Sequence, residues 1–223
     1  MKRKTNIAVK TFGEKGYSFS VCSDLLEKKE KIIVYSFGIG ENLSFSKELN
    51  DRYKNCKIYA FDPTPKAIKY VEEYDKSSFG FFEFFPFGLS DKDEIVDFYL
   101  PLNVSYVSGS EVMNPGVDKN RVIKVQMHTL KYIMQMLDHT YIDILKLDIE
   151  GSEFTAVPQL LEECQNIEQI CVEAHHRFYA DGDIRLHDMI CLLKQYEYHL
   201  AEISESEEEL LFIKNNFAYD KKE

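Results

Sequence analysis

The stretch IIVYSFGIG, residues 32–40, decides the fold class. Its first six residues are apolar or aromatic apart from one serine, which is typical of a buried strand. Gly38 and Gly40 then allow a tight turn and the close approach of a ligand that a side chain would block. A glycine pair alone is a weak signal, so the segments on either side of it carry the interpretation.

Strand-like and helix-like segments alternate through the rest of the chain. The pattern predicts strands at 58–61, 81–87, 141–147 and 167–174, and helices at 43–54, from Thr64-Pro65, at 129–137, up to about Cys164, and at 183–196. Ser44, Thr64 and Thr129 are the expected N-caps, and Pro158 is expected near the first turn of its helix. This alternation predicts an α/β fold, a Rossmann-like, doubly wound and mostly parallel sheet. Residues 198–203 and 210–213 are expected to close it as an antiparallel hairpin.

A single domain is expected over residues 1–223, with 1–30 as an N-terminal extension and 91–128 as an insertion on the acceptor side. Strands are expected at 95–100 and 122–127 within that insertion. The basic start, Met1–Lys4, is followed by no apolar segment, and no apolar run is long enough to span a bilayer. The five cysteines are odd in number and never spaced as CxxC, which favours reduced thiols. We therefore expect a cytoplasmic protein without a membrane partner.

The charge balance bears on the partner. Acidic residues outnumber basic ones, 38 to 27, and the formal net charge is −11. A protein that binds the phosphates of nucleic acid needs a face rich in lysine and arginine, and none stands out. We expect a small molecule or a carbohydrate as the partner and no nucleic acid.

The ends of the first two predicted strands favour one cofactor over another. Asp62 follows the second strand, at the distance from the glycine loop where a carboxylate commonly meets the ribose hydroxyls of an adenine nucleotide. A dinucleotide fingerprint would place a third glycine where Leu43 stands. S-adenosylmethionine has no pyrophosphate to seat, so the pattern favours this methyl donor over NAD.

Charged residues gather at the ends of two later strands. Lys146, Asp148 and Glu150 alternate along one strand, so their side chains project to the same side. Glu173 and His175 share one face of the strand expected beside it. If Lys146 lies against Glu173 as a buried ion pair, the same register places Asp148 near His175.

At this point the chain resembles the FkbM-type methyltransferases. The resemblance rests on VYSFGIGENLSF (34–45), IYAFDPTP (58–65), TLKYI (129–133), IDILKLDIEGSEF (142–154) and ICVEAHH (170–176), in the order and spacing of the family. It implies a Rossmann-like methyltransferase fold, S-adenosylmethionine as donor, and an oxygen acceptor, often a hydroxyl of a sugar or natural product. The chain departs from the commoner pattern at Ser36, where many members carry an acidic residue.

The expected site has two halves. The cofactor half comprises Ser36, Phe37, Gly38, Gly40, Asp62, Pro63, Gly88, Leu89 and Asp148. In the catalytic half, His175 is the expected general base, with Asp148 and Glu150 beside it to orient it or bind the acceptor. A second interpretation places a magnesium or manganese ion on Asp148, Glu150, Glu153 and His175.

Two functions of other classes remain open from the residues alone. Asp148 and Glu150 form an acidic pair at a strand end, as in metal-dependent glycosyltransferases that use nucleotide-sugars. A catalytically inactive binding domain could also retain the fold. The glycine loop after the first strand argues against the glycosyltransferase.

Overall fold

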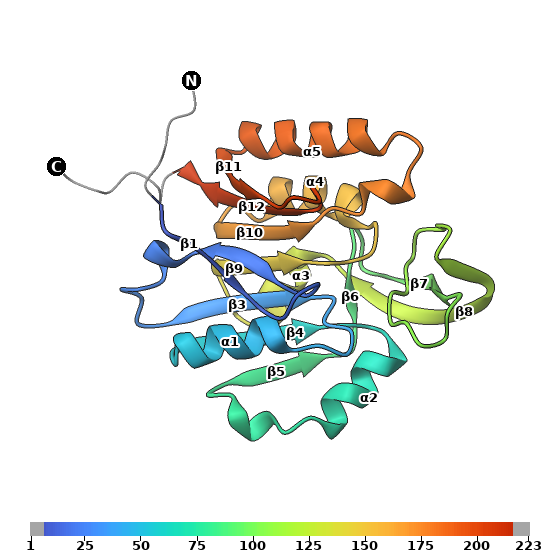
Figure 1. Cartoon of the computed structure of the whole chain (residues 1–223), viewed down its shortest axis with the longest axis horizontal. Coiled ribbons are helices and arrows are strands. Elements are labelled where there is room, and N and C mark those ends of the chain that lie inside the picture. Colours follow the sequence, from blue (N-terminus) through green and yellow to red (C-terminus); the bar gives the residue numbers. More distant parts are fainter. Residues whose placement is uncertain (1–6, 216–223) are drawn as a thin grey trace.

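The computed structural model describes residues 7–215 of the chain, which form a central sheet with helices on both faces (Figure 1). Residues 1–6 and 216–223, the two ends of the expected domain with the basic start Met1–Lys4, lie outside the described residues. The helices and strands are β1 (Val9–Phe12), β2 (Phe19–Cys22), η1 (Ser23–Leu25), β3 (Ile32–Phe37), α1 (Ser44–Arg52), β4 (Cys56–Phe61), α2 (Pro65–Glu73), η2 (Lys76–Ser78), β5 (Phe82–Phe85), β6 (Gly88–Leu89), β7 (Glu94–Pro101), β8 (Val117–His128), α3 (Leu130–Met136), β9 (Ile142–Leu147), α4 (Glu153–Glu163), β10 (Ile167–Glu173), η3 (His176–Phe178), α5 (Gly182–Gln195), β11 (Tyr198–Ile203) and β12 (Glu209–Lys214).

The main sheet has the strand order β11-β12-β10-β9-β3-β4-β5. Strands β10, β9, β3, β4 and β5 are parallel, and β12 runs antiparallel between β10 and β11. The order reverses at β3 and β9, so the carboxyl ends of these two strands form the crevice where such folds bind ligands. The predicted fold class, with its mostly parallel sheet and closing antiparallel pair, is confirmed.

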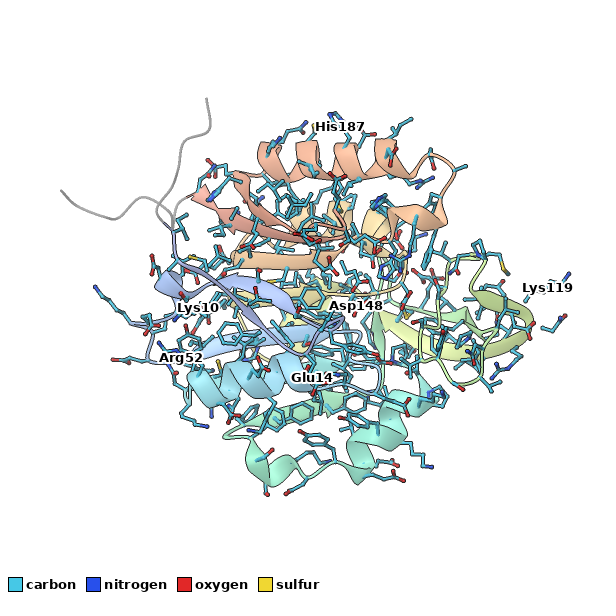
Figure 2. All side chains as sticks on the ribbon, in the orientation of Figure 1. Lys10, Glu14, Arg52, Lys119, Asp148 and His187 are labelled. Atoms are coloured by element: carbon cyan, nitrogen blue, oxygen red, sulfur yellow. The ribbon has the colours of Figure 1, made fainter. Side chains whose placement is uncertain are left out.

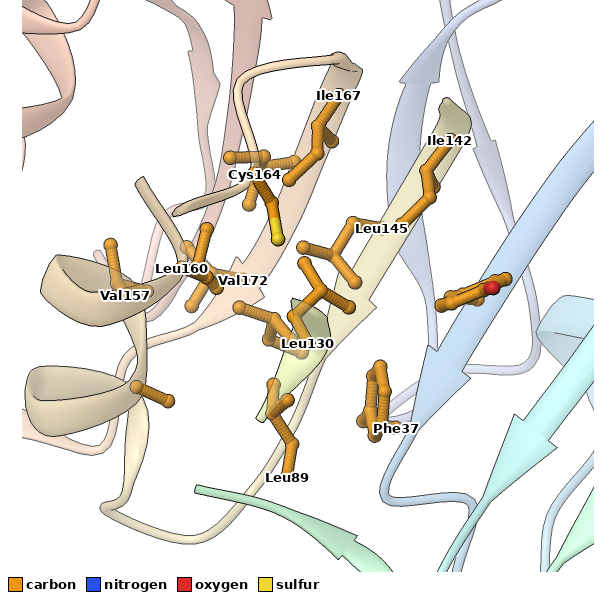
Figure 3. Packing of buried hydrophobic residues seen from close by; sticks show 14 of the residues in the cluster. Phe37, Leu89, Leu130, Ile142, Leu145, Val157, Leu160, Cys164, Ile167 and Val172 are labelled. Carbon is orange, nitrogen blue, oxygen red and sulfur yellow. The ribbon is translucent and has the colours of Figure 1, made fainter. Parts of the chain in front are cut away.

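Successive side chains of β3 face two different cores. Tyr35 and Phe37 pack with residues of α3, α4 and α5, whereas Ile32 and Val34 pack with residues of α1, α2 and the β1–β2 hairpin. Figure 3 shows the first of these cores, to which α4 contributes Leu160 and the sheet contributes Leu145 and Val172. The strand is buried on both faces, which explains why its sequence is a continuous apolar run rather than an alternating one.

The segment 91–128 contains β7 and β8, which form a small second sheet with the preceding β6 in the order β6-β8-β7. Its β7–β8 hairpin extends away from the main sheet, and Lys119 lies at its far end (Figure 2). At the other end of the chain, β1 and β2 form a hairpin that packs against the main sheet. The buried amide of Gln169 on β10 holds this hairpin through hydrogen bonds to the backbone of Cys22, at 2.7 and 3.3 Å.

Three local expectations were wrong. The aromatic run 81–87 is split into β5 and the short β6, which pairs with β8 instead of continuing along the main sheet. Ser44 is the first residue of α1 and not its cap, whereas Thr64 and Thr129 do cap their helices. The helix α4 begins at Glu153, so Pro158 lies in its second turn. The Glu153 carboxylate explains the early start, because it accepts the backbone N–H groups of the preceding turn.

All five cysteines lie in the described part and are free thiols. Among residues 7–215, no helix has both the length and the apolar composition that crossing a membrane requires.

A partly buried ion pair lies at the amino-terminal end of β9, at the opposite end of this strand from Asp148. The carboxylate of Asp143 accepts hydrogen bonds from the Lys29 ammonium at 2.5 Å and from the backbone N–H of Ile33 at 2.6 Å. Replacing this carboxylate leaves a buried amide without a partner, so Asp143→Ala should lower the free energy of unfolding by about 2–4 kcal/mol. The control is Asp97→Ala, which removes an exposed pair with Lys124 and should cost about 0–1 kcal/mol. Urea denaturation checks both, and equal midpoints would contradict the expectation.

Candidate functional site

The glycine loop lies directly against the end of β9. Gly38 has a φ of +72°, and a Cβ atom built on it would lie 1.7 Å from the carbonyl oxygen of Asp148. Gly40 also has a positive φ, +52°, and its Cβ would lie 2.8 Å from the side chain of Val107. Only glycine fits the first of these positions, because a backbone carbonyl cannot move aside as a side chain can.

Asp62 connects the end of β4 to the same loop. Its carboxylate accepts hydrogen bonds from the backbone N–H of Gly40 at 2.9 Å, and from the N–H and hydroxyl of Thr64 at 2.8 and 2.6 Å. Burial raises the pKa of Asp62, although these three donors oppose that shift. A carboxylate has about four acceptor positions, so one remains for a ligand hydroxyl.

A pocket extends from the glycine loop across the carboxyl ends of β3, β4 and β9. Its lining includes Phe37, Gly38, Gly40, Phe61, Asp62, Pro63, Gly88, Leu89, Asp148 and Glu150. The structure therefore brings together every expected cofactor-side residue except Ser36. Neighbouring strand residues face opposite sides, and Ser36 lines a smaller adjoining hollow with Asn42 and Lys146.

The lining also includes residues that the sequence did not indicate. Val107, Ser108 and Gly109 come from the connection between β7 and β8, and Tyr17 comes from the turn between β1 and β2. The Lys66 ammonium, on α2, donates to the carbonyl of Tyr106 at 3.0 Å and ties the first of these segments to the main domain. Their approach depends on long-range packing, so no local pattern marked them.

Lys146 does not pair with Glu173. The register places Lys146 opposite Cys171, two residues earlier than expected. Its ammonium donates instead to the carbonyls of Phe37 and Gly38, at 3.2 and 2.6 Å, and to the Asp148 carboxylate at 3.1 Å. The predicted ion pair is wrong, and the cation holds the glycine loop to the end of β9.

Four carboxylates surround the imidazole of His175, and one of them belongs to Asp148, which Figure 2 labels. The Nδ1 atom lies 2.9 Å from Glu153, and Nε2 lies 3.4 Å from Glu150, 3.5 Å from Glu173 and 3.8 Å from Asp148. Asp148 lies near His175 as expected, but in a different register from the one on which that expectation rested. Glu173 is an addition to the expected site, and its signal was its position two residues before His175 on one strand.

The environment of His175 argues against its role as a simple base. The residue is 1% exposed and is not among the residues that line the pocket. Burial lowers its pKa, but the charges of Glu153, Glu150 and Asp148 outweigh burial and raise the pKa to about 10. At neutral pH the imidazole is therefore already protonated on both nitrogens and cannot accept another proton.

The turn between β9 and α4 is strained and firmly held. Glu150 has a φ of +52°, which a residue with a side chain seldom adopts, and Gly151 follows with +105°. The hydroxyl of Ser110 donates to the Glu150 carbonyl at 2.6 Å, and that of Tyr179 donates to the Gly151 carbonyl at 2.8 Å. This conformation directs the Glu150 side chain into the pocket.

The pocket suits S-adenosylmethionine. Its walls are largely apolar and aromatic, as an adenine ring requires, and its charged groups are the carboxylates of Asp62, Asp148 and Glu150. Carboxylates accept from ribose hydroxyls and favour a cationic sulfonium and ammonium. A missing Cβ keeps the wall open at Gly88, where the added atom would lie 2.5 Å from the sulfur of Met127.

The strand order and the glycine-loop pocket define a Rossmann-like α/β domain of the methyltransferase type. Residues 33–200 match the family of the methyltransferase FkbM domain, and the chain belongs to that family. It is an S-adenosylmethionine-dependent methyltransferase. A search of curated proteins found no match to the sequence.

Several solved structures are similar in part. They include a Methanococcus jannaschii fibrillarin pre-rRNA processing protein (10% identity, TM-score 0.47, covering 83% of this chain and 67% of that one). A precorrin-6y C5,15-methyltransferase from Geobacter metallireducens has 11% identity and a TM-score of 0.43, and covers 86% of this chain and 85% of that one. The M. jannaschii protein TYW2, in complex with AdoMet, has 10% identity and a TM-score of 0.35, and covers 96% and 85%. These likenesses are distant, and the assignment rests on the family match.

The two loop glycines should respond differently to substitution. Gly38→Ala places a methyl group against the Asp148 carbonyl, so it should lower the free energy of unfolding by about 2–5 kcal/mol. Gly40→Ala meets only a flexible valine side chain and should cost about 1–2 kcal/mol. Thermal unfolding followed by circular dichroism compares them. A Gly38→Ala protein as stable as the wild type would show that the loop does not lie against β9.

Proposed function

We propose that the protein transfers the methyl group of S-adenosylmethionine to a hydroxyl oxygen of a sugar or a sugar-containing natural product. The observation that carries this proposal is the continuity of the pocket. One cavity extends from the glycine loop and Asp62 to the carboxylates of Asp148 and Glu150. A donor seated at the loop would therefore have its reactive end beside groups that can bind and deprotonate an alcohol.

In the expected reaction, the acceptor oxygen attacks the methyl carbon in line with the carbon–sulfur bond. The carbon–oxygen bond forms as the carbon–sulfur bond breaks, and the sulfur keeps the electron pair as a neutral thioether. The hydroxyl proton must go to a base. Glu150 lines the pocket, and burial raises the pKa of its carboxyl group towards the range of a useful base. We therefore assign Glu150 as the base that accepts the hydroxyl proton and Asp148 as the residue that binds the acceptor. His175 lies next to both carboxylates and does not contact the acceptor in this assignment.

The acidic character of the site supports a neutral acceptor. Three carboxylates, those of Asp148, Glu150 and Glu173, are grouped at the catalytic end, and they would repel phosphate. A polyhydroxylated molecule can donate hydrogen bonds to all of them. An overall net charge of −11 points away from nucleic acid in the same way.

The two rival functions make different demands on the pocket. A glycosyltransferase needs room and cations for a nucleotide diphosphate, whereas the described lining offers carboxylates beside the glycine loop. The family match also favours methyl transfer. An inactive binding domain would hold the donor without turnover, so binding and turnover need separate measurements.

The first test is donor binding. Asp62→Ala removes the carboxylate that faces the donor and holds Gly40, so it should weaken S-adenosylmethionine binding by about 2–4 kcal/mol. Isothermal titration calorimetry measures the loss. The exposed variant Asp97→Ala is the control and should bind as the wild type does. NAD should give no heat, UDP-glucose with Mn²⁺ should give no heat beyond that of Mn²⁺ alone, and unchanged affinity in Asp62→Ala would remove this residue from the site.

The second test is turnover. Glu150→Gln keeps the shape of the side chain but cannot accept a proton, so it should lower the methyl-transfer rate about 100- to 10,000-fold. Its affinity for S-adenosylmethionine should change little. The assay follows S-adenosylhomocysteine formation with a panel of uncharged glycosides, with Glu205→Gln, in an exposed acidic turn, as the matched control. A Glu150→Gln enzyme with the wild-type rate would show that another group takes the proton.

A further inference from the structure

The carboxylate of Glu153, which is itself fixed by backbone hydrogen bonds, holds the imidazole of His175 in one orientation. Glu153 accepts hydrogen bonds from the backbone N–H groups of Ile149 and Gly151, each at 3.0 Å, and lies 2.9 Å from His175 Nδ1. An acceptor-only group in this position requires that Nδ1 carry a proton. The other nitrogen, Nε2, then points at Asp148, Glu150 and Glu173.

The Nε2 atom has neighbours but no hydrogen bond. Its distances to the three carboxylates, 3.4 to 3.8 Å, are those of close charges rather than of aligned donors and acceptors. His175 is 1% exposed, so water does not provide the missing partner freely. A ring nitrogen of an almost fully buried residue that converges with three carboxylates, with no hydrogen bond to any of them, is a suitable ligand for an ion between them.

We propose that Asp148, Glu173 and Nε2 of His175 bind a divalent cation of the Mn²⁺ type, with Glu153 as the positioning residue for the imidazole. The three ligand atoms lie within 4.8 Å of one another. In an octahedral site with bonds of about 2.1 Å, ligand atoms are about 3.0 Å apart when adjacent and about 4.2 Å apart when opposite. A contraction of less than an ångström would therefore close the site.

This ligand set differs from the one expected from the sequence. Glu153 was an expected ligand, but both its oxygens are occupied, and it acts behind the histidine as carboxylates commonly do in metal sites. Glu173 takes its place. Asp148 can bind an ion without losing its contact with Lys146, because Oδ2 accepts a hydrogen bond from Lys146 while Oδ1 faces the imidazole. Two carboxylates and one imidazole favour a manganese-type ion over calcium, which prefers oxygen ligands alone.

The site is open on one side. The side chains of Asp148 and Glu173 are 21% and 19% exposed, so an ion can enter and keep positions for water or hydroxyl oxygens. Asp148 also lines the pocket, which brings those open positions to the acceptor end. The catalytic consequence of the ion rests on the proposed function. An acceptor hydroxyl bound to the ion would have a lower pKa and would lose its proton to Glu150 more readily.

The competing explanation is an imidazolium ion that is stabilised by four carboxylates and serves only the fold. The two explanations differ in what the ion-free protein does with Mn²⁺. The electron paramagnetic resonance signal of free aqueous Mn²⁺ is lost on binding, which counts bound ions without any acceptor. Chelator-treated wild-type protein should bind one Mn²⁺ per chain, with and without S-adenosylmethionine.

Three variants test the assignment. Glu173→Gln and His175→Asn each remove a ligand and should weaken Mn²⁺ binding at least tenfold. Glu153→Gln should weaken it about 10- to 100-fold through the orientation of the imidazole. Thermal unfolding shows whether each variant is folded, and Glu173→Gln, the least buried, keeps the test valid if the other two are not. Glu205→Gln, in an exposed acidic turn, should bind as the wild type does and controls for the net negative charge.

The outcomes separate this inference from the proposed function. No Mn²⁺ uptake by the wild type, or equal uptake by Glu173→Gln, overturns the metal site. Methyl transfer that persists in excess chelator also overturns it, while leaving the methyltransferase intact. Stoichiometric Mn²⁺ binding that these variants abolish supports the site even where no acceptor in the panel is methylated. In that case only the proposed acceptor class fails.

Discussion

The site depends on the buried ammonium of Lys146. It joins two carbonyls at the end of β3 to the carboxylate of Asp148 at the end of β9, and it lies 4.8 Å from the ring centre of Phe19. A cation that is 5% exposed is tolerable only when its donors are all satisfied, and these acceptors do so. Because Gly38 has no side chain, the loop and the strand end can approach closely enough for one cation to hold both. The pocket and the acidic cluster then lie on either side of Asp148.

Asp148 is consequently shared between two environments. One oxygen is fixed by the Lys146 cation, and the other faces an imidazole that is surrounded by carboxylates. The positive charge on one side reduces the repulsion that this carboxylate would otherwise feel from Glu150 and Glu173 on the other. A site with so many acids needs such a cation, since the energy of like charges rises steeply as they leave water. The arrangement allows these carboxylates to stay close together, in a position to bind a positively charged ligand.

The sequence predicted the strands and their ends because those depend on local patterns. Apolar runs that stop at Gly38, Asp62, Asp148 and His175 are visible without any knowledge of packing. The structure places all four residues at the carboxyl ends of the parallel strands. The offset between β9 and β10 was not predictable in this way. A parallel pair can shift by two residues and keep the same faces buried. The alternating pattern of the two strands therefore fitted two registers equally well, and it did not decide whether Lys146 lies opposite Glu173. The hairpin of β1 and β2 was missed because each strand has only four residues, although Gly13 and Gly16 between them are typical of a turn.

The remaining part of the site comes from segments outside the repeating strand-and-helix pattern. The strained turn at Glu150 is held by Ser110, from the β7–β8 connection, and the following Gly151 by Tyr179, from the turn before α5. The same connection contributes Val107 to Gly109 to the wall of the pocket. A general methyltransferase fold would provide the glycine loop and the strand ends without these contacts. Holding a non-glycine residue at φ +52° costs free energy that only additional bonds can offset. The added segments therefore do more than cover the pocket, because they fix the backbone of Glu150, whose carboxylate we propose as the base.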